Sequence, residues 1–112
     1  MKEVDYTLET LLDLDGYIAE IGNEYWFKIE AKKVKIGVNK PFGIKYALTL
    51  HDPSGQRIMG FDNAHAVLKG SLKEPHDHFH KGRIIKKYNY ISAGKLLEDF
   101  WQEVDLNLKG GV

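Results

Sequence analysis

The chain has 112 residues, with 16 basic and 16 acidic side chains, five histidines and no cysteine. This length suits one domain, residues 1–112 with a frayed tail at 109–112. The absence of cysteine excludes thiol catalysis, zinc–thiolate sites and disulfides. No apolar run approaches the roughly 20 residues of a membrane span, and the polar start does not resemble a signal peptide. We therefore expect a soluble, cytoplasmic protein that does not use a membrane.

Charge is segregated along the chain although the total is zero. Residues 1–27 carry seven acidic side chains and one lysine, whereas residues 28–45 carry six lysines and one glutamate. A protein that binds nucleic acid through an overall positive charge is therefore excluded, but a local basic face is not.

Segments of alternating or β-branched residues, separated by turn residues, predict strands along most of the chain. The predicted strands are residues 10–13, 17–21, 25–36, 44–50, 57–61 and 83–90. Gly22-Asn23 indicates a hairpin turn, and residues 52–55 carry Pro and Gly where a four-residue turn favours them. The alternation in residues 25–36 is typical of an antiparallel strand with one solvent-exposed face.

The remainder of the chain predicts a long connection and a helix. Residues 62–82 show little periodicity, and connections of this length tend to be functional. After Ser92, a good N-cap residue, apolar side chains recur at helical spacing from Ala93 onward. These apolar positions are Leu96, Leu97, Phe100, Trp101, Val104 and Leu108. The predicted fold class is α+β, an antiparallel sheet of about five strands with one C-terminal amphipathic helix.

A cluster of histidines lies in the long connection. In an extended chain His76, His78 and His80 would share one side, with Asp77 and Phe79 on the other. Three interpretations stay open. A pair of imidazoles can act as general acid and base, since imidazole titrates near neutral pH. Two or three imidazoles with Asp62 could bind a transition metal. A polar loop could also simply order itself by hydrogen bonds.

Arg83 follows the histidines and favours phosphodiester chemistry. Cleavage of RNA needs a base for the 2′-hydroxyl, an acid for the leaving oxygen and a positive charge beside the phosphorane. Arg83 could instead belong to a solvated basic strand, and Asp62 or Asn63 could instead form an Asx turn.

Lysines interleaved with aromatic residues suggest a track for RNA phosphates and bases. The candidate RNA-binding residues are Lys32, Lys33, Lys35, Trp26, Lys86 and Lys87. A solvated edge strand, on which lysines discourage edge pairing, is the alternative interpretation.

Several of these segments resemble the TumE family, small bacterial and archaeal toxins of toxin–antitoxin systems. The resemblance covers about residues 17–108 and is most specific in Asp62-Asn63-Ala64-His65 and Asp77-His78-Phe79-His80. It extends to residues 46–52, 60–67, 77–80 and 96–104. It implies a small α+β fold and a partner, an antitoxin with a helix-turn-helix domain that binds DNA. It supplies no agreed set of catalytic residues.

We therefore expect a toxin that is a metal-independent endoribonuclease without a cofactor. Its acid and base would be His78 and His80, Arg83 would stabilise the phosphorane, and Asp62 or Asp77 would orient an imidazole. The full set of candidate catalytic residues is His78, His80, Arg83, Asp62, Asp77 and His65. The alternatives are a non-catalytic module that acts through its partner or by sequestering a target, and a metal-dependent hydrolase. Whether the chain forms homo-oligomers stays open.

Overall fold

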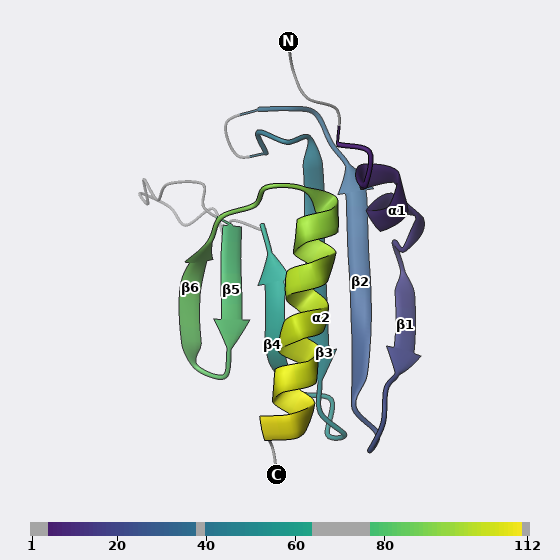
Figure 1. Cartoon of the computed structure of the whole chain (residues 1–112), viewed down its shortest axis with the longest axis vertical. Coiled ribbons are helices and arrows are strands. Elements are labelled where there is room, and N and C mark those ends of the chain that lie inside the picture. Colours follow the sequence, from purple (N-terminus) through teal and green to yellow (C-terminus); the bar gives the residue numbers. More distant parts are fainter. Residues whose placement is uncertain (1–4, 38–39, 64–76, 111–112) are drawn as a thin grey trace.

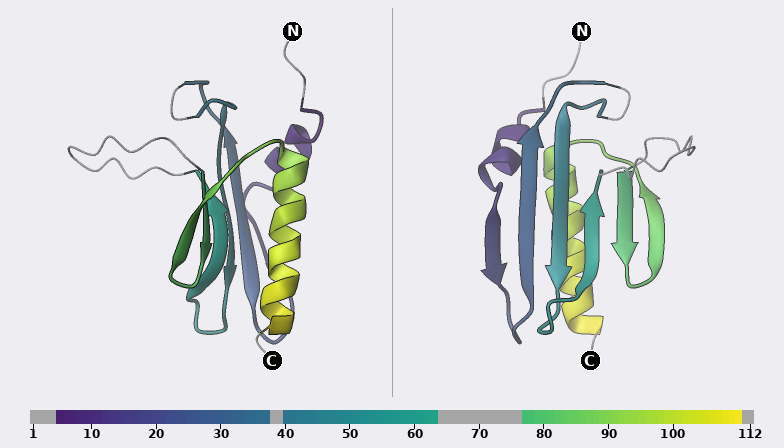
Figure 2. Two further views of the ribbon diagram at one scale, coloured as in Figure 1. Left: turned by 60° about the vertical axis from the view of Figure 1, so that its left-hand side comes forward. Right: turned by 180° about the vertical axis from the view of Figure 1, so that it is seen from behind.

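A computed structural model describes residues 5–37, 40–63 and 77–110 of the chain. Within these residues, six antiparallel strands follow one another in chain order across one sheet, and two helices lie against one of its faces (Figures 1 and 2). The elements are α1 (Leu8–Asp13), β1 (Tyr17–Glu20), β2 (Trp26–Lys33), β3 (Ile44–His51), β4 (Arg57–Asp62), β5 (Asp77–Lys81), β6 (Ile84–Tyr88) and α2 (Ala93–Gly110). The predicted α+β class is confirmed, with six strands where we expected about five.

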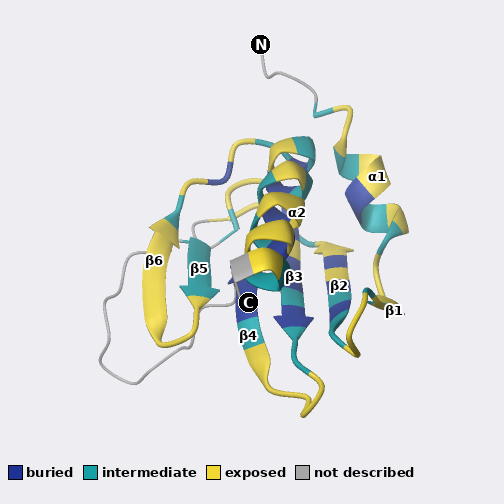
Figure 3. Cartoon of the chain, turned by 60° about the horizontal axis from the view of Figure 1, so that its bottom comes forward, coloured by how far each residue is buried: buried dark blue, intermediate teal, exposed yellow. Residues whose placement is uncertain are grey.

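The central strands bury one face and leave the other accessible. In β2 the buried residues are Phe27, Ile29 and Ala31, and the residues between them are more exposed. β3 alternates in the same way along its whole length. The buried side chains meet the apolar stripe of α2, whereas β1 and β6 are exposed along most of their length (Figure 3). The predicted strand with one solvent-exposed face is therefore confirmed for β2.

Helix α2 forms as its periodicity predicts. Ala93, Leu96, Phe100 and Val104 are buried at spacings of three or four residues, which places them on one side of a helix. Ser92 is the predicted cap, and its Oγ accepts a hydrogen bond from Lys95 N at 3.1 Å. The helix continues to Gly110, so it includes residues 109 and 110 of the predicted tail.

The predicted strand at residues 10–13 is wrong, because this segment belongs to helix α1. Leu8, Leu11 and Leu12 are spaced three and four residues apart, which brings them to one side of a helix. Leu11 is fully buried, and the other two leucines pack against the same core. Contact with α2 thus determines the conformation of a segment too short to show clear periodicity.

The expectation of one continuous connection over residues 62–82 is also wrong, because β5 lies within it. β5 pairs with β4 on one side and with β6 on the other. Its only apolar residue is Phe79, whose ring lies 4.8 Å from that of Phe61 across the strands. A strand with a single apolar residue gives almost no alternating signal, which is why the sequence did not reveal it.

The hairpin of β5 and β6 is connected to α2 by polar contacts. Tyr88 Oη donates a hydrogen bond of 2.6 Å to Asp99 Oδ2, and Lys81 Nζ lies 3.4 Å from Glu103 Oε1. Burial, reinforced by the neighbouring Asp99 carboxylate, raises the pKa of Tyr88 far above its ordinary value, so the phenol remains a donor. These contacts fix the hairpin that carries His78 and His80. Among the described residues, no helix combines the length and apolar character needed to span a bilayer.

Candidate functional site

The sheet face opposite the helices carries the polar side chains. We call it the open face, because no helix or strand of the described residues covers it (Figure 2). Strand register determines which residues lie on it together. Its central residues are Lys28, Glu30, Ala47, Thr49, Gly60, Asp62, His78 and His80. Ala47 and Thr49 have small side chains, and Gly60 has none. The larger side chains of Asp62, His78 and His80 therefore have free space beside them on this face.

Asp62, His78 and His80 form a cluster on this face. His80 Nε2 lies 3.1 Å from Asp62 Oδ2, and His78 Nδ1 lies 3.8 Å from Asp62 Oδ1. The ring centroids of the two histidines are 6.0 Å apart. The side chains are partly accessible, with exposed fractions of 13% for Asp62, 16% for His80 and 31% for His78. The structure thus brings together three of the candidate catalytic residues, His78, His80 and Asp62.

His80 favours its neutral form. Burial lowers the pKa of His80, and the positive charges of Arg57 and His78 lower it further, while the Asp62 carboxylate opposes this shift. The net pKa lies below the ordinary value for histidine. A neutral imidazole next to a carboxylate can accept a proton from a substrate hydroxyl.

Arg57 is the guanidinium-bearing residue next to this cluster. Gly60 lies directly opposite His80 across the strands. A Cβ added at Gly60 would lie only 3.1 Å from Thr49 Cγ2 and 3.6 Å from Arg57 Cδ. Arg57 therefore passes close to Gly60, and its positive charge acts on His80.

Sequence reasoning missed Arg57 because of a bulge. Met59 pairs with Leu50 but Arg57 pairs with His51, so Ile58 is an extra residue in β4. Simple alternation from Gly60 would send Arg57 to the helix side, whereas the bulge returns it to the open face. The sequence around Arg57 and Gly60 contains no pattern that identifies Arg57 as a site residue. The pairing of β3 with β4 has to be known first.

Trp26 and His51 form a stacked pair at one end of the open face. Their rings are 3.9 Å apart and nearly parallel, with an interplanar angle of 6°. His51 Nδ1 lies 3.2 Å from the Gly55 carbonyl oxygen, and Nε2 lies 2.9 Å from Thr49 Oγ1. Because a carbonyl can only accept, Nδ1 is the donor, and in the neutral ring Nε2 accepts from the Thr49 hydroxyl. These contacts fix the His51 ring, and His51 lies directly opposite Arg57 across the strands.

Two predicted catalytic residues lie elsewhere. Arg83 is exposed in the turn between β5 and β6. Asp77 lies on the helix side of β5, where its Oδ2 accepts a hydrogen bond of 2.6 Å from Tyr46 Oη. Burial and this carboxylate raise the pKa of Tyr46 far above the ordinary value. The structure therefore brings neither residue into the cluster, and His65 lies outside the described residues.

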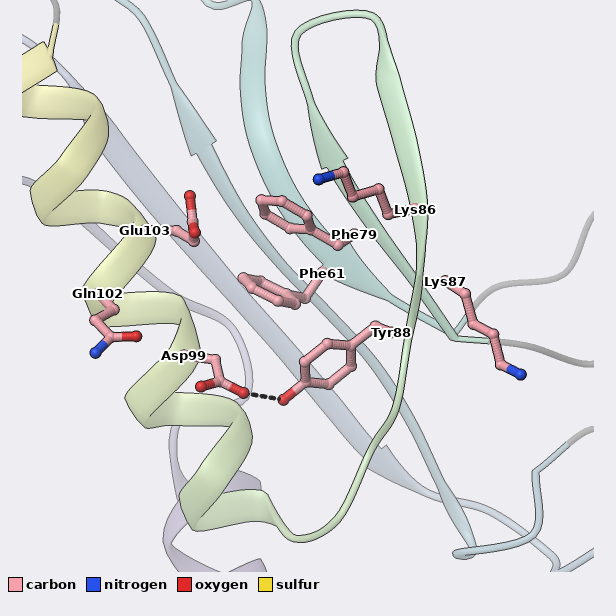
Figure 4. A pocket seen from close by; sticks show the side chains of 8 residues that line it. All are labelled: Phe61, Phe79, Lys86, Lys87, Tyr88, Asp99, Gln102 and Glu103. Atoms are coloured by element: carbon pink, nitrogen blue, oxygen red, sulfur yellow. Dashed lines mark hydrogen bonds between the residues drawn. The ribbon is translucent and has the colours of Figure 1, made fainter.

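The predicted RNA-binding lysines are divided among several surfaces. Lys32 Nζ lies 2.8 Å from Asp15 Oδ2 and is therefore paired, while Lys33 and Lys35 are exposed. Lys87 lies opposite His78 across the strands, on the open face. Lys86 projects from the other side of β6 and lines a hollow of about 210 Å³ beside α2 (Figure 4).

That hollow is separate from the cluster. Its apolar floor is formed by Phe61 and Phe79, and α2 contributes Asp99, Gln102 and Glu103 (Figure 4). A second hollow of about 280 Å³ is lined by residues of β2 and β3, including Ala47, the cross-strand neighbour of Asp62.

Comparison with known proteins identifies a family for this chain. A family model described as Toxin TumE matches residues 16–108, most of the chain. No curated protein and no solved structure matches the chain. The matched range includes all six strands and all of α2 except its last two residues.

Proposed function

We propose a chemical activity from the premise that this chain belongs to the TumE family of toxins. That activity is cleavage of RNA at the open face without a metal ion. Membership of a toxin family implies an antitoxin partner. The helix-turn-helix type of that antitoxin stays a prediction.

The observation that supports the proposal is the cluster of two imidazoles around one carboxylate, with a guanidinium beside them. His78 and His80 are 6.0 Å apart, a separation that allows both rings to approach one phosphodiester group. Asp62 lies within 3.8 Å of a nitrogen in each ring and can stabilise the imidazolium of either. Arg57 supplies the positive charge that we expected from Arg83.

The reaction assigns one role to each group. Neutral His80 removes the proton of a ribose 2′-hydroxyl, and the 2′-oxygen attacks the adjacent phosphorus. Arg57 stabilises the negative charge of the phosphorane. The bond from phosphorus to the 5′-oxygen breaks as His78 in its protonated form donates a proton to that oxygen. The products are a 2′,3′-cyclic phosphate and a 5′-hydroxyl.

Neighbouring open-face residues would hold the RNA. Lys28 and Lys87 are on the same face and can contact backbone phosphates, although Lys28 Nζ also lies 3.6 Å from Glu30 Oε1. The stacked rings of Trp26 and His51 offer a surface on which a base can stack. Lys33 and Lys35 are exposed near the end of β2, and contact between these two lysines and RNA stays a prediction.

The test is incubation of the purified protein with total RNA in the presence of a chelator. We expect cleavage that leaves a 2′,3′-cyclic phosphate end. The rate of cleavage should be highest at about pH 6–7. The His78→Ala/His80→Ala double variant should not cleave RNA. The double variant should also fail to inhibit growth, and circular dichroism should show that it remains folded.

Three outcomes would contradict the proposal. Absence of cleavage by the wild-type protein would favour a binding module that acts by sequestration. Cleavage that requires a metal ion would favour a metal-dependent hydrolase. A folded double variant that still inhibits growth would show that the site lies elsewhere.

A further inference from the structure

The cluster of Asp62, His78 and His80 also has the composition of a metal-binding site. One ligand atom from each side chain lies within 4.8 Å of the other two. The closest pair, His80 Nε2 and Asp62 Oδ2, is 3.1 Å apart. Two ligands on one tetrahedral ion with bonds of about 2.0 Å are separated by roughly 3.3 Å. Small side-chain rotations would therefore bring all three ligand atoms to one ion.

We propose that these three side chains bind Zn²⁺ and that the bound ion inhibits the cleavage of RNA. Two imidazoles and one carboxylate are ligands that zinc accepts, and three protein ligands leave a position open for water. The carboxylate supplies a negative charge, and the partial burial of all three side chains limits competition from bulk solvent. The strands fix the spacing, because His78 and His80 are on one side of β5 and Asp62 pairs directly with His78.

The surroundings make this site weaker than a dedicated structural zinc site. Arg57 lies near His80, and Lys87 is opposite His78, so two positive side chains oppose the binding of a cation. We therefore expect reversible binding, and Arg57→Gln should bind Zn²⁺ more tightly than the wild-type protein. Reversible binding is the property that an inhibitory ion requires.

Bound zinc would inhibit RNA cleavage because it occupies nitrogen lone pairs of His78 and His80. A neutral imidazole that holds zinc through one nitrogen carries its only proton on the other nitrogen. The ring can then neither accept the proton of a 2′-hydroxyl nor take up a second proton for the leaving oxygen. This half of the inference rests on the proposed function, whereas the binding of Zn²⁺ does not.

Calorimetric titration of the full chain with Zn²⁺ tests the binding directly. We expect one ion per chain at this site and at least a roughly tenfold loss of affinity in Asp62→Asn and in His80→Ala. The matched control is His51→Ala, which removes an imidazole from the same face but outside the cluster and should bind Zn²⁺ as the wild-type protein does. His65 and His76 stay intact in all four proteins, so zinc bound there does not change between them.

Binding that is unchanged in both Asp62→Asn and His80→Ala would overturn the zinc site. Thermal unfolding of each variant, followed by circular dichroism, verifies that the loss of affinity does not come from loss of the fold. Asp62→Asn preserves the shape of the side chain but removes its charge and one of its two acceptor oxygens. It therefore serves as the second variant if His80→Ala unfolds.

Cleavage assays test the inhibitory effect separately. RNA cleavage should fall when Zn²⁺ is added and should return when a chelator removes it. Cleavage that Zn²⁺ leaves unchanged or increases would overturn the inhibition. If zinc binds as expected but no cleavage occurs even with the chelator, the proposed function fails and the metal site stands.

Discussion

Neutral His80 makes the stability of the folded protein dependent on pH. In the unfolded chain histidine titrates near pH 6.5, whereas burial, Arg57 and His78 lower the pKa of His80 in the folded protein. Between these two values the unfolded state binds more protons, so stability decreases as the pH falls below about 6.5. The stabilising contribution is fully present above that pH and is lost progressively as the pH falls toward the lower, folded pKa.

Comparison of the wild-type protein with His80→Gln tests this effect. Urea unfolding with a chelator present, at about pH 7.5 and about pH 5.5, should show a smaller loss of stability in the variant, which cannot titrate at residue 80. The other histidines are common to both proteins and contribute equally. Equal losses in the two proteins would show that the pKa of His80 does not change on folding.

Asn63 continues the pairing of β4 beyond its last residue. It is 4% exposed, its Oδ1 accepts a hydrogen bond of 3.0 Å from Tyr46 N, and its Nδ2 donates one of 2.7 Å to Ile44 O. These contacts, rather than an Asx turn, account for the polar residue after Asp62. Asn63→Ala would leave buried backbone groups without partners.

We expect Asn63→Ala to lower the free energy of unfolding by about 1–3 kcal/mol. Urea unfolding at neutral pH measures the difference. The matched control is Asn89→Ala, which removes the same side chain from an exposed residue and should change stability by less than about 0.5 kcal/mol. Similar values for the two variants would indicate that water replaces the contacts of Asn63.

At the residue scale, alternation alone predicted part of the site. It correctly placed His78 and His80 on one side of an extended chain and Asp77 on the other. It could not show that Asp62 is the carboxylate they meet, because that depends on which strand pairs with β5. It also could not identify Arg57, because a bulge reverses the side on which that residue projects.

At the element scale, the first turn of α2 depends on residues from the other end of the chain. Asp5 Oδ2 accepts a hydrogen bond of 2.9 Å from Ala93 N, and Thr7 Oγ1 accepts one of 2.7 Å from Gly94 N. Burial would raise the pKa of Asp5, but hydrogen bonds from Thr7 and Ala93 outweigh it, and the net pKa is below the ordinary value. The N-terminal segment thus caps a helix that begins nearly 90 residues later.

Asp5→Ala should destabilise the protein by about 1 kcal/mol, the usual cost of losing a capping side chain. Asp5→Asn should lose less, since its amide oxygen can still accept the hydrogen bond from Ala93. Thermal unfolding of the two variants beside the wild-type protein measures this order. If Asp5→Asn is as unstable as Asp5→Ala, the charge matters more than the hydrogen bond.

The elements that the sequence predicted well are those with long periodic patterns. Helix α2 has 18 residues and strands β2 and β3 have eight each, and all three show their buried side clearly. Helix α1 has six residues and β5 has five, and tertiary contacts determine the conformation of both. The prediction failed where local pattern is too short to outweigh packing.

At the scale of the whole molecule, the two faces of the sheet have different roles. Both helices lie on one face, where the core is, and the opposite face is left for the cluster and the stacked rings (Figure 2). The chemistry that we propose therefore depends on cross-strand neighbours, not on residues adjacent in the sequence. The two arginines can test this statement. Arg57 lies next to the cluster in space, whereas Arg83 follows His80 closely in the sequence.

The rates of RNA cleavage by the variants Arg57→Gln and Arg83→Gln show which arginine acts in the reaction. Arg57→Gln should lower the rate of RNA cleavage roughly 100-fold, the typical loss when one group that stabilises transition-state charge is removed. Arg83→Gln, in the exposed turn, should cleave RNA at nearly the wild-type rate. Both proteins should unfold at temperatures close to that of the wild-type protein, since neither arginine is buried. The reverse order of activities would restore Arg83 as the phosphate-binding residue and would place the substrate at the turn of the β5–β6 hairpin instead of over Gly60.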